Sequence, residues 1–330
     1  MTKEVTLKHY IQGEVKLSDF AIVDKTLSAL QESEVLVKNN WMSVDPYMRG
    51  RMIDRKSYIP PFQLKQALEG SAVGIVQESK SQRYQKGDMV LSMKGWREAF
   101  IANERELIKL PARAHEEDYL GVMGMPGMTA YTGLLKIGKP KEGECVFVSA
   151  ASGAVGSLVC QIAKLKGCKV IASVGSDEKV KWLKEVLGVD EAFNYKKHPD
   201  LNSILKKVAA NGIDVYFENV GGKHLEAAIN HMNAHGRIVV CGMISQYNLD
   251  HPEPGPTNLA QIIGKRLLLK GFIVSDYDDV KPEFYTQMDK WLETGKVHYK
   301  THVYQGIDKA PEAFINLFKG ENIGKMLVKL

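Results

Sequence analysis

The spacing of apolar residues divides the chain into two parts with different patterns. Up to about residue 122, short apolar runs alternate with polar positions and are broken by Gly, Pro, Asn and Asp. Such a pattern is typical of antiparallel strands joined by turns. It predicts strands within 34–40, 70–79, 87–96 and 97–111. The first part of the chain is therefore expected to form a compact β-rich domain.

From about residue 123, continuous apolar runs alternate with segments of helical period. The predicted strands are 144–150, 169–174, 191–195, 213–221 and 237–242, and the predicted helices between them are 154–167, 176–188, 201–212 and 223–236. Continuous apolar runs suit strands that are buried on both faces, and strict strand–helix alternation favours a doubly wound parallel sheet. A sheet of this kind binds its ligand at the carboxyl ends of the strands.

The last third of the chain adds three segments to this α/β pattern. A helix running into a strand is predicted over 259–274, and an amphipathic helix over 284–296. Residues 313–330 predict a helix, a turn and a final strand, which can complete either domain.

Composition narrows the class of protein. The 330 residues carry a net charge of +5 that is spread along the chain, which argues against a nucleic-acid partner. No apolar run approaches the roughly 18–20 residues of a membrane helix, and the N-terminal segment mixes charges throughout. We therefore expect no membrane partner, no secretory signal and a cytoplasmic location. Four widely spaced cysteines, Cys145, Cys160, Cys168 and Cys241, are expected to be buried thiols rather than a disulfide framework.

The most informative motif is the loop 150–156, which reads AASGAVG between a predicted strand and a predicted helix. Gly153 permits a tight turn and close approach of a pyrophosphate, and Gly156 permits close helix–strand packing. The helix N-terminus adds partial positive charge. Ala151 takes the place of the first glycine of the usual pattern, so a tight connection in another α/β fold is the alternative. The five alternating units that follow favour a dinucleotide site.

The end of the next strand indicates which dinucleotide the chain is expected to bind. An NAD site usually has an Asp or Glu about 20 residues after the glycine loop, bound to the ribose. Here the strand ends at Val174-Gly175-Ser176, with no carboxylate at its tip and with Lys179 one turn later. Gly175, Ser176 and Lys179 provide room and donors for a phosphate, so we expect NADP(H). The alternative for Lys179 is a solvated helix lysine.

Further motifs along nearly the whole chain carry a family resemblance. They are SVDPYMR (43–49), GMPGMTAY (124–131), AASGAVG (150–156), VGSDEK (174–179), FNYK (193–196), ENVGG (218–222), CGMIS (241–245) and NIGK (322–325). With these blocks in this order, the chain resembles the zinc-independent medium-chain dehydrogenase/reductases. Within them it is similar to the leukotriene 12-hydroxydehydrogenase/15-oxoprostaglandin 13-reductase group, which includes alkenal double-bond reductases.

The resemblance implies a fold, a coenzyme and a set of binding residues. It implies a GroES-like catalytic domain over 1–122, a Rossmann domain over 123–300 and a C-terminal return to the catalytic domain over 301–330. It also implies NADPH, with Lys179 and Tyr195 at the 2′-phosphate, the 153–156 loop at the pyrophosphate, and Thr129 near the nicotinamide after a Met-Pro-Gly turn. The full implied set is Thr129, Gly153, Ala154, Val155, Gly156, Ser176, Lys179, Tyr195, Asn219, Cys241, Gly242, Met243, Ile244, Ser245, Phe272, Ile273, Val274 and Asn322. Family members are typically homodimers, and the 267–274 strand is a candidate for pairing between subunits or else an interior strand.

No metal site is expected. Where zinc-containing relatives have a histidine, this chain has Leu68, and the lobe of closely spaced cysteines is missing. His224, His231 and His235 fall in one predicted helix, and the last two are spaced to share a face. A solvated helix face is the favoured interpretation of these histidines.

Without a metal, a conjugated substrate is the chemically favoured one. Hydride addition to the β-carbon of an enone or enal places charge on an enolate oxygen, which needs only hydrogen bonds. Tyr47 is the leading candidate donor, with a structural tyrosine as the alternative, and Tyr247 is the second candidate. Relatives often have a tyrosine where this chain has Gly264. The predicted activity is NADPH-dependent reduction of α,β-unsaturated ketones and aldehydes. A quinone oxidoreductase of the same superfamily and a non-catalytic NADPH-binding protein remain alternatives.

A basic group beside Tyr47 has two interpretations. Arg49, Arg51, Arg55 and Lys56 can attract a carboxylate tail of the substrate, or they can form a solvated loop. The solvated loop is favoured.

Overall fold

The computed structural model describes residues 1–112 and 115–330 and divides the chain into two compact units. Unit 1 contains Met1–Leu120, Thr301–Asn322 and Met326–Leu330, and unit 2 contains Gly121–Lys300 and Ile323–Lys325. The α/β class is confirmed, with a parallel sheet in unit 2 and a separate β-rich unit 1.

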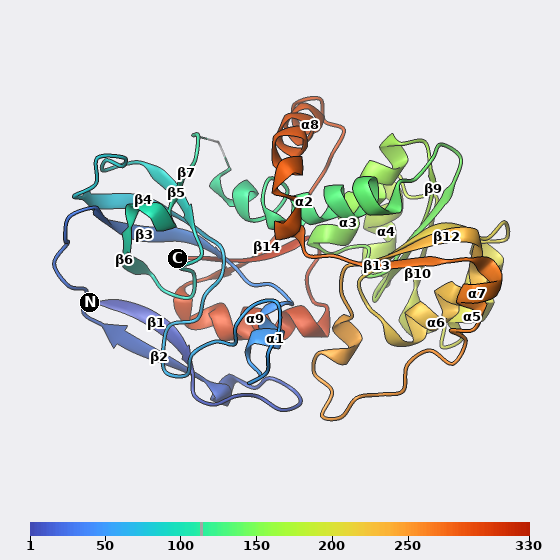
Figure 1. Ribbon diagram of the computed structural model, residues 1–330, viewed down its shortest axis with the longest axis horizontal. Helices are drawn as coiled ribbons and strands as arrows, with labels where there is room; N and C mark the ends of the chain where they lie inside the picture. Colours follow the sequence, from blue (N-terminus) through green and yellow to red (C-terminus); the bar gives the residue numbers. More distant parts are fainter. Residues whose placement is uncertain (113–114) are drawn as a thin grey trace. The chain divides into compact units, whose positions relative to one another are not determined.

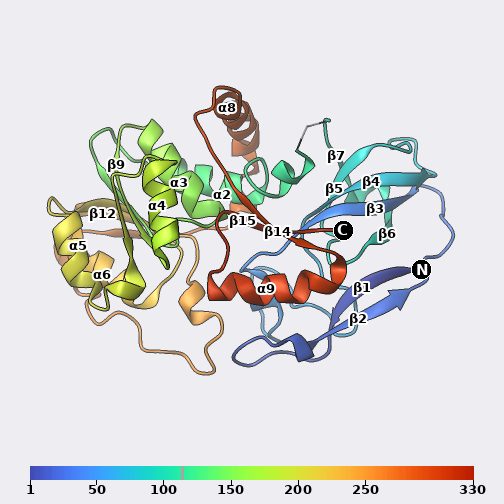
Figure 2. The ribbon, with the colours of Figure 1, turned by 180° about the vertical axis from the view of Figure 1, so that it is seen from behind.

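Unit 1 contains two sheets (Figures 1 and 2). Strands β1 (Thr2–Leu7) and β2 (Phe20–Lys25) form an antiparallel pair. The larger sheet has the order β14-β15-β3-β4-β5-β7, with β6 also paired to β3. Its strands are β3 (Glu34–Ser43), β4 (Ala72–Ser79), β5 (Met89–Ser92), β6 (Ala99–Asn103), β7 (Ile108–Lys109), β14 (Thr301–Gln305) and β15 (Lys325–Lys329).

The final strand completes the sheet of unit 1. Leu327 of β15 lies opposite Ser43 of β3 in an antiparallel pairing. Helix α9 (Ala310–Lys319) precedes this strand and packs its buried face into the core of unit 1. The sequence allowed this strand to complete either domain, and in the structure it belongs to the sheet of unit 1.

The core of unit 1 is apolar and includes two arginines. Leu68 is fully buried in it. Arg49, which is 1% exposed, donates to the carbonyl oxygen of Gly13 at 2.7 Å. Arg51 stacks on the Phe62 ring at 4.1 Å and pairs with Glu69 at 2.6 Å. The interpretation of this basic group as a solvated loop is therefore wrong for Arg49 and Arg51, because both guanidinium groups are used inside the unit.

Unit 2 is built on a six-stranded sheet of order β10-β9-β8-β11-β12-β13, in which every pairing is parallel. The strands are β8 (Cys145–Val148), β9 (Lys169–Val174), β10 (Glu191–Asn194), β11 (Ile213–Glu218), β12 (Met232–Val240) and β13 (Leu268–Gly271). β13 is an edge strand of this sheet, so its interpretation as an interior strand is wrong.

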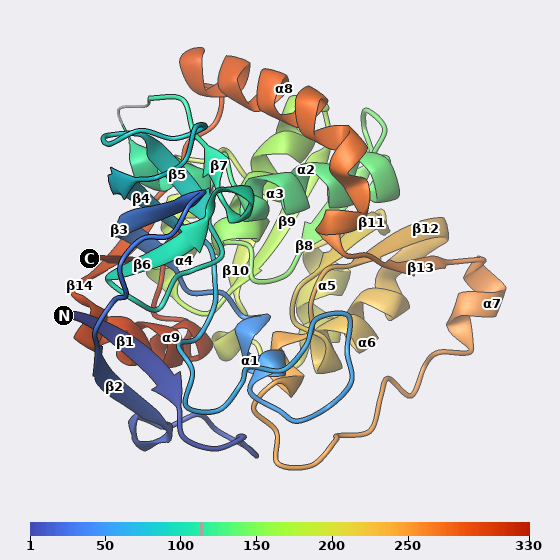
Figure 3. The same ribbon diagram turned by 60° about the vertical axis from the view of Figure 1, so that its left-hand side comes forward.

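Helices cover both faces of this sheet. Helices α2 and α3 lie on one face and α5 and α6 on the other (Figure 3). The helices of unit 2 are α2 (Met125–Thr132), α3 (Ala154–Leu165), α4 (Asp177–Glu185), α5 (Leu201–Val208), α6 (Gly222–His231), α7 (Gln261–Lys265) and α8 (Lys281–Glu293). A short helix α1 (Met48–Arg51) lies in unit 1. Among the described residues, no helix combines the length and apolar character needed to cross a bilayer.

Two local predictions about unit 2 are wrong. The predicted Met-Pro-Gly turn at 125–127 instead begins helix α2, because proline is tolerated in the first helical turn. The helix predicted over 223–236 ends at His231, and β12 begins at the next residue. His231 and His235 therefore do not share a helix face, and His224 is buried rather than solvated.

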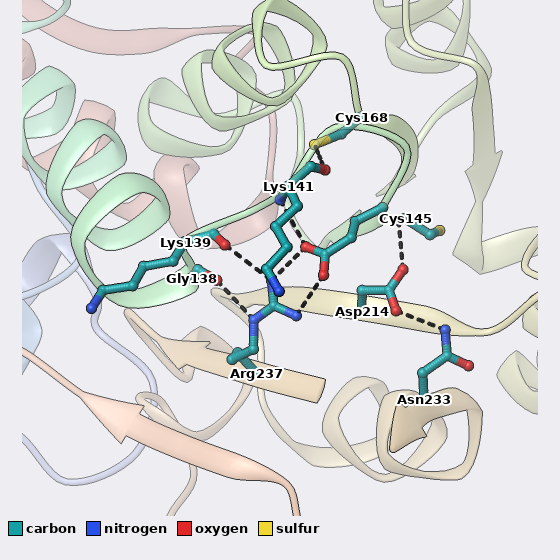
Figure 4. Close-up of polar contacts among 9 residues, drawn as sticks. Gly138, Lys139, Lys141, Cys145, Cys168, Asp214, Asn233 and Arg237 are labelled. Atoms are coloured by element: carbon teal, nitrogen blue, oxygen red, sulfur yellow. Dashed lines mark hydrogen bonds and ion pairs between the residues drawn. The ribbon is translucent and has the colours of Figure 1, made fainter. Parts of the chain in front are cut away.

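A polar network closes the amino-terminal end of the sheet (Figure 4). Arg237 donates from Nε to the carbonyl oxygen of Gly138 at 2.9 Å and from a terminal nitrogen to that of Lys139 at 3.1 Å. These carbonyls end the π-helical segment Gly133–Gly138 that continues α2. Arg237 also forms a two-pronged ion pair with Glu144. A cavity of about 480 Å³ lies beside this network, and its lining shares no residue with the predicted coenzyme set.

Candidate functional site

The 150–156 loop has the geometry of an anion-binding turn. Gly153 is the N-cap of α3 and offers no side-chain acceptor to the helix. The first N–H groups of the helix, at Ala154, Val155 and Gly156, have no intrahelical acceptor and are available to a ligand. A Cβ at Gly156 would lie 2.5 Å from the carbonyl oxygen of Ala150. Glycine is therefore required there for the loop to close over the helix.

Two hydrogen bonds fix this loop to neighbouring segments of unit 2. The N–H of Ala151 donates to the carbonyl oxygen of Ser173 in β9 at 3.1 Å. The N–H of Gly324 donates to that of Ser152 at 2.7 Å. The C-terminal segment Ile323–Lys325 thus lies against the glycine loop, and Asn322 is the residue directly before it.

Basic and aromatic side chains gather where β9 ends. A Cβ built on Gly175 would lie 3.4 Å from Cε1 of Tyr195 and 3.4 Å from Cε of Lys196. Lys179 is only 8% exposed, and burial together with the charge of Lys196 lowers its pKa. Ser176 caps α4 by accepting the N–H of Lys179 at 3.3 Å. Lys196 lies beside Gly175 and its charge acts on Lys179, so two lysines make this strand end suited to a phosphate.

The acidic residue nearest this strand end is already engaged. Asp177 accepts from the side-chain amide of Asn194 at 3.0 Å and forms an ion pair with Lys197. Hydrogen bonds from these partners lower the pKa of Asp177. Its carboxylate is therefore committed to neighbouring side chains rather than to a ribose.

The other half of the predicted coenzyme set lies at the ends of β11 and β12. Asn219 donates its side-chain amide to the carbonyl oxygen of Ser149 at 2.8 Å. The N–H groups of Cys241 and Gly242 both donate to the carbonyl oxygen of Glu218. The N–H of Ile244 donates to that of Asn219 at 3.1 Å, so the 241–245 segment and Asn219 lie together.

Thr129 lies in helix α2, and Phe272 lies beside the end of the same helix. The Thr129 hydroxyl donates to the carbonyl oxygen of Met125 within α2 at 2.7 Å. A Cβ at Gly133, just past the end of α2, would lie 2.8 Å from the Phe272 ring. The absence of a side chain at Gly133 therefore lets the segment that begins at Phe272 and includes Ile273 and Val274 approach this helix.

Glu218 is a buried carboxyl group beneath these loops. Its Oε1 accepts the N–H groups of Val220 and Gly221 at 2.6 and 2.8 Å and the Ser149 hydroxyl at 3.1 Å. Its Oε2 is buried without a hydrogen-bond partner among the described residues. Burial raises the pKa of Glu218 in spite of these donors.

Replacing Glu218 with glutamine should make the protein comparatively more stable at alkaline pH. A raised pKa in the folded state means that Glu218 contributes stability at low pH and loses it as the pH rises through that pKa. A glutamine side chain cannot ionise, so the variant gains about 1.4 kcal/mol relative to the parent for each unit of upward shift. Urea unfolding at pH 5 and pH 8 measures this gain, with Glu185→Gln as control, because Glu185 is an exposed residue of α4. The prediction would be contradicted if the free energies of unfolding of variant and parent differed by the same amount at both pH values.

The two candidate tyrosines are placed differently. Tyr47 in unit 1 is half-buried, and its hydroxyl has no hydrogen-bond partner among the described residues. Burial and the Asp45 carboxylate raise its pKa, so the phenol stays protonated and can donate. The Tyr247 hydroxyl accepts the N–H of Met243 at 3.2 Å. Gly264 lies in α7, and a Cβ there would meet nothing within 4 Å.

Sequence reasoning missed several residues that shape this site. Lys196 stands beside the predicted phosphate position, and its place two residues after the end of β10 was a usable signal. His224 contacts Ser173, and Glu218 contacts Ser149, both distant in sequence, so the sequence assigned neither residue to the site although Glu218 falls in the ENVGG motif and His224 in a predicted helix. No group of three or more His, Cys, Asp or Glu side chains suited to a metal occurs in the described part of the chain.

Comparisons with known proteins agree with this geometry. A family described as the N-terminal domain of oxidoreductase matches residues 3–110, and the zinc-binding dehydrogenase family matches residues 154–293. The chain is 47% identical to the NADP⁺-dependent 2-alkenal reductase of Nicotiana tabacum, over 99% of this chain and 96% of that protein. It is 45% identical to prostaglandin reductase 1 of Bos taurus, over 99% and 98%. The solved structure of CurA from Vibrio vulnificus in complex with NADPH is 42% identical, with a TM-score of 0.95 over 99% of this chain and 98% of that one.

Proposed function

Because the chain belongs to the zinc-independent medium-chain dehydrogenase/reductases, in the group of alkenal and prostaglandin reductases, we propose that it uses NADPH to reduce the carbon–carbon double bond of α,β-unsaturated ketones and aldehydes. The observation that carries this proposal is the strand end at Gly175. Lys196 lies beside Gly175, the charge of Lys196 acts on buried Lys179, and the carboxylate nearest in the sequence, Asp177, is engaged. This donor set fits the 2′-phosphate that distinguishes NADPH from NADH.

The coenzyme is proposed to be bound and oriented by residues of unit 2 together with Asn322, the residue directly before the Ile323–Lys325 segment of unit 2. The N–H groups of Ala154, Val155 and Gly156 at the start of α3 hold the pyrophosphate. Lys179 and Tyr195, with Ser176 beside them, hold the 2′-phosphate. The nicotinamide half is held by Thr129, Asn219, the 241–245 segment, Phe272–Val274 and Asn322. When bound, NADPH supplies the hydride for the reaction.

Tyr47 is proposed to stabilise the charge that develops on the substrate. Reduction at the β-carbon of an enone moves negative charge to the carbonyl oxygen, and a phenol that stays protonated can donate a hydrogen bond to it. Tyr247 is the second candidate donor, although its hydroxyl oxygen already accepts a backbone N–H. The reaction is proposed to need no metal, since hydrogen bonds suffice to stabilise an enolate.

Replacing Tyr47 with phenylalanine tests this role. One hydrogen bond to a charged oxygen is lost, so kcat for a small enone should fall roughly tenfold while the Kd of NADPH stays unchanged. Stopped-flow measurement of NADPH oxidation separates the chemical step from product release. Tyr247→Phe is the matched control, for which we expect a smaller effect. Undiminished turnover in Tyr47→Phe would remove Tyr47 from the mechanism.

The assembly is proposed to be a homodimer, and the compartment the cytoplasm. Edge strand β13 offers free backbone groups on its outer side, and Leu268 and the nearby Ile263 are 49% and 81% exposed. Pairing of β13 with its counterpart in a second copy would cover these side chains. All four cysteines are unpaired thiols, which suits a reducing compartment.

A further inference from the structure

A buried histidine links the loop after β11 to the phosphate end of the site. His224 lies in the first turn of α6 and is 5% exposed. Its Nε2 lies 2.9 Å from the hydroxyl oxygen of Ser173, a fully buried residue of β9. Burial lowers the pKa of His224 to about 4, so the ring is neutral near pH 7. The hydrogen bond fixes the rotation of the imidazole relative to the sheet.

The imidazole also packs against Tyr195. The two ring centroids are 5.1 Å apart and the ring planes are inclined at 81°, an edge-to-face contact. Tyr195 follows β10 directly and is 37% exposed, so few other groups restrain it. The position of a Cβ on Gly175 lies 3.5 Å from the Tyr195 hydroxyl, which places the phenol over the end of β9. His224 therefore supports one side of a ring that is otherwise half open.

A purely structural role does not account for this arrangement. A leucine or methionine would fill the same apolar space without burying a polar ring. The hydrogen bond with Ser173 instead fixes the imidazole in the orientation that meets Tyr195 edge to face. The three residues come from β9, the segment after β10, and α6, and together they set where the Tyr195 hydroxyl lies.

We infer that His224 is a positioning residue for coenzyme selectivity: held by Ser173, it keeps Tyr195 over Gly175, where the phenol can meet the 2′-phosphate of NADPH. The inference rests on the proposed role of Tyr195 in phosphate binding. It assigns His224 no contact with the coenzyme and no part in hydride transfer.

The test compares the Kd of NADPH and of NADH in His224→Leu and Ser173→Ala, measured by fluorescence titration. We expect His224→Leu to raise the Kd of NADPH roughly three- to tenfold, the size of one lost ring contact, and to change that of NADH less than about twofold. Ser173→Ala keeps the imidazole and should give the same selectivity change at smaller size. It also serves if His224→Leu folds poorly. His231→Leu, at the far end of α6, is the control.

A double-mutant cycle with Tyr195→Ala separates positioning from general stability. If His224 acts through Tyr195, adding His224→Leu to Tyr195→Ala should not weaken NADPH binding further. Additive losses, or equal losses for NADPH and NADH, would overturn the inference. Unchanged NADPH affinity in Tyr195→Ala alone would overturn it too, together with the role of Tyr195. If the proposed reaction is wrong, the parent protein will not turn over enals, and this result is distinct from the binding results above.

Discussion

Replacing Lys179 with alanine should raise the Kd of NADPH on the order of a hundredfold and leave that of NADH within about twofold. Lys179 is 8% exposed, and burial and the charge of Lys196 both lower its pKa, so its ammonium group is held at a desolvation cost. A divalent phosphate offsets that cost, and a free ribose hydroxyl does not. The measurement is fluorescence titration of both coenzymes.

The matched control for this variant is Lys181→Ala on the same helix. The Lys181 side chain is 72% exposed and pairs only loosely with Glu185, so neither affinity should change. Burial also lowers the pKa of Lys179, and NADPH affinity should therefore begin to fall at a lower pH than an ordinary lysine would cause. If Lys179→Ala lost affinity for NADPH and NADH equally, the lysine would not be the group that recognises the 2′-phosphate.

Replacing Gly324 with alanine should lower the free energy of unfolding by roughly 2–4 kcal/mol and weaken NADPH binding. Gly324 has a φ of +76°, and a Cβ there would lie 1.9 Å from the carbonyl oxygen of Lys300. The backbone must shift to relieve this contact, and the shift would break the hydrogen bond from Gly324 to Ser152 in the glycine loop. Urea unfolding and coenzyme titration measure the two effects.

The Gly295→Ala variant separates the effect of backbone strain from the effect of the steric clash that a Cβ at Gly324 would cause. Gly295 has a φ of +63°, but a Cβ there would meet nothing within 4 Å. This variant should lose only about 1 kcal/mol, from the left-handed conformation, and should bind NADPH normally. If Gly324→Ala behaved like Gly295→Ala, the C-terminal segment would not be needed to hold the glycine loop.

Elements whose causes are local were predictable from the sequence. The helix N-cap at Ser176 follows from a hydroxyl three residues before the amide that it accepts. The apolar runs of β8 and β9 follow from burial on both faces. The helix predicted through 223–236 was too long because pairing of β12 with β11 overrides the helical period after His231.

Features of the site that depend on distant residues could not be predicted in this way. The contact of Ser173 with His224 joins residues 51 positions apart, and nothing local indicates it. Arg49 and Arg51 carry charges that suggest a solvated loop, yet backbone carbonyls and the Phe62 ring inside unit 1 accept them. The burial of Lys179, on which the proposed phosphate recognition depends, is likewise a property of the folded unit.

The central claim is that this chain uses NADPH to saturate activated alkenes. Its most direct test follows NADPH absorbance with purified protein and a panel of enals, enones and quinones, with NADH as the control coenzyme. We expect rapid oxidation of NADPH with enals and enones, a saturated carbonyl product with the C=O intact, and much slower reaction with NADH. Reduction of quinones alone, reduction of the carbonyl group instead of the alkene, or a preference for NADH would contradict the account.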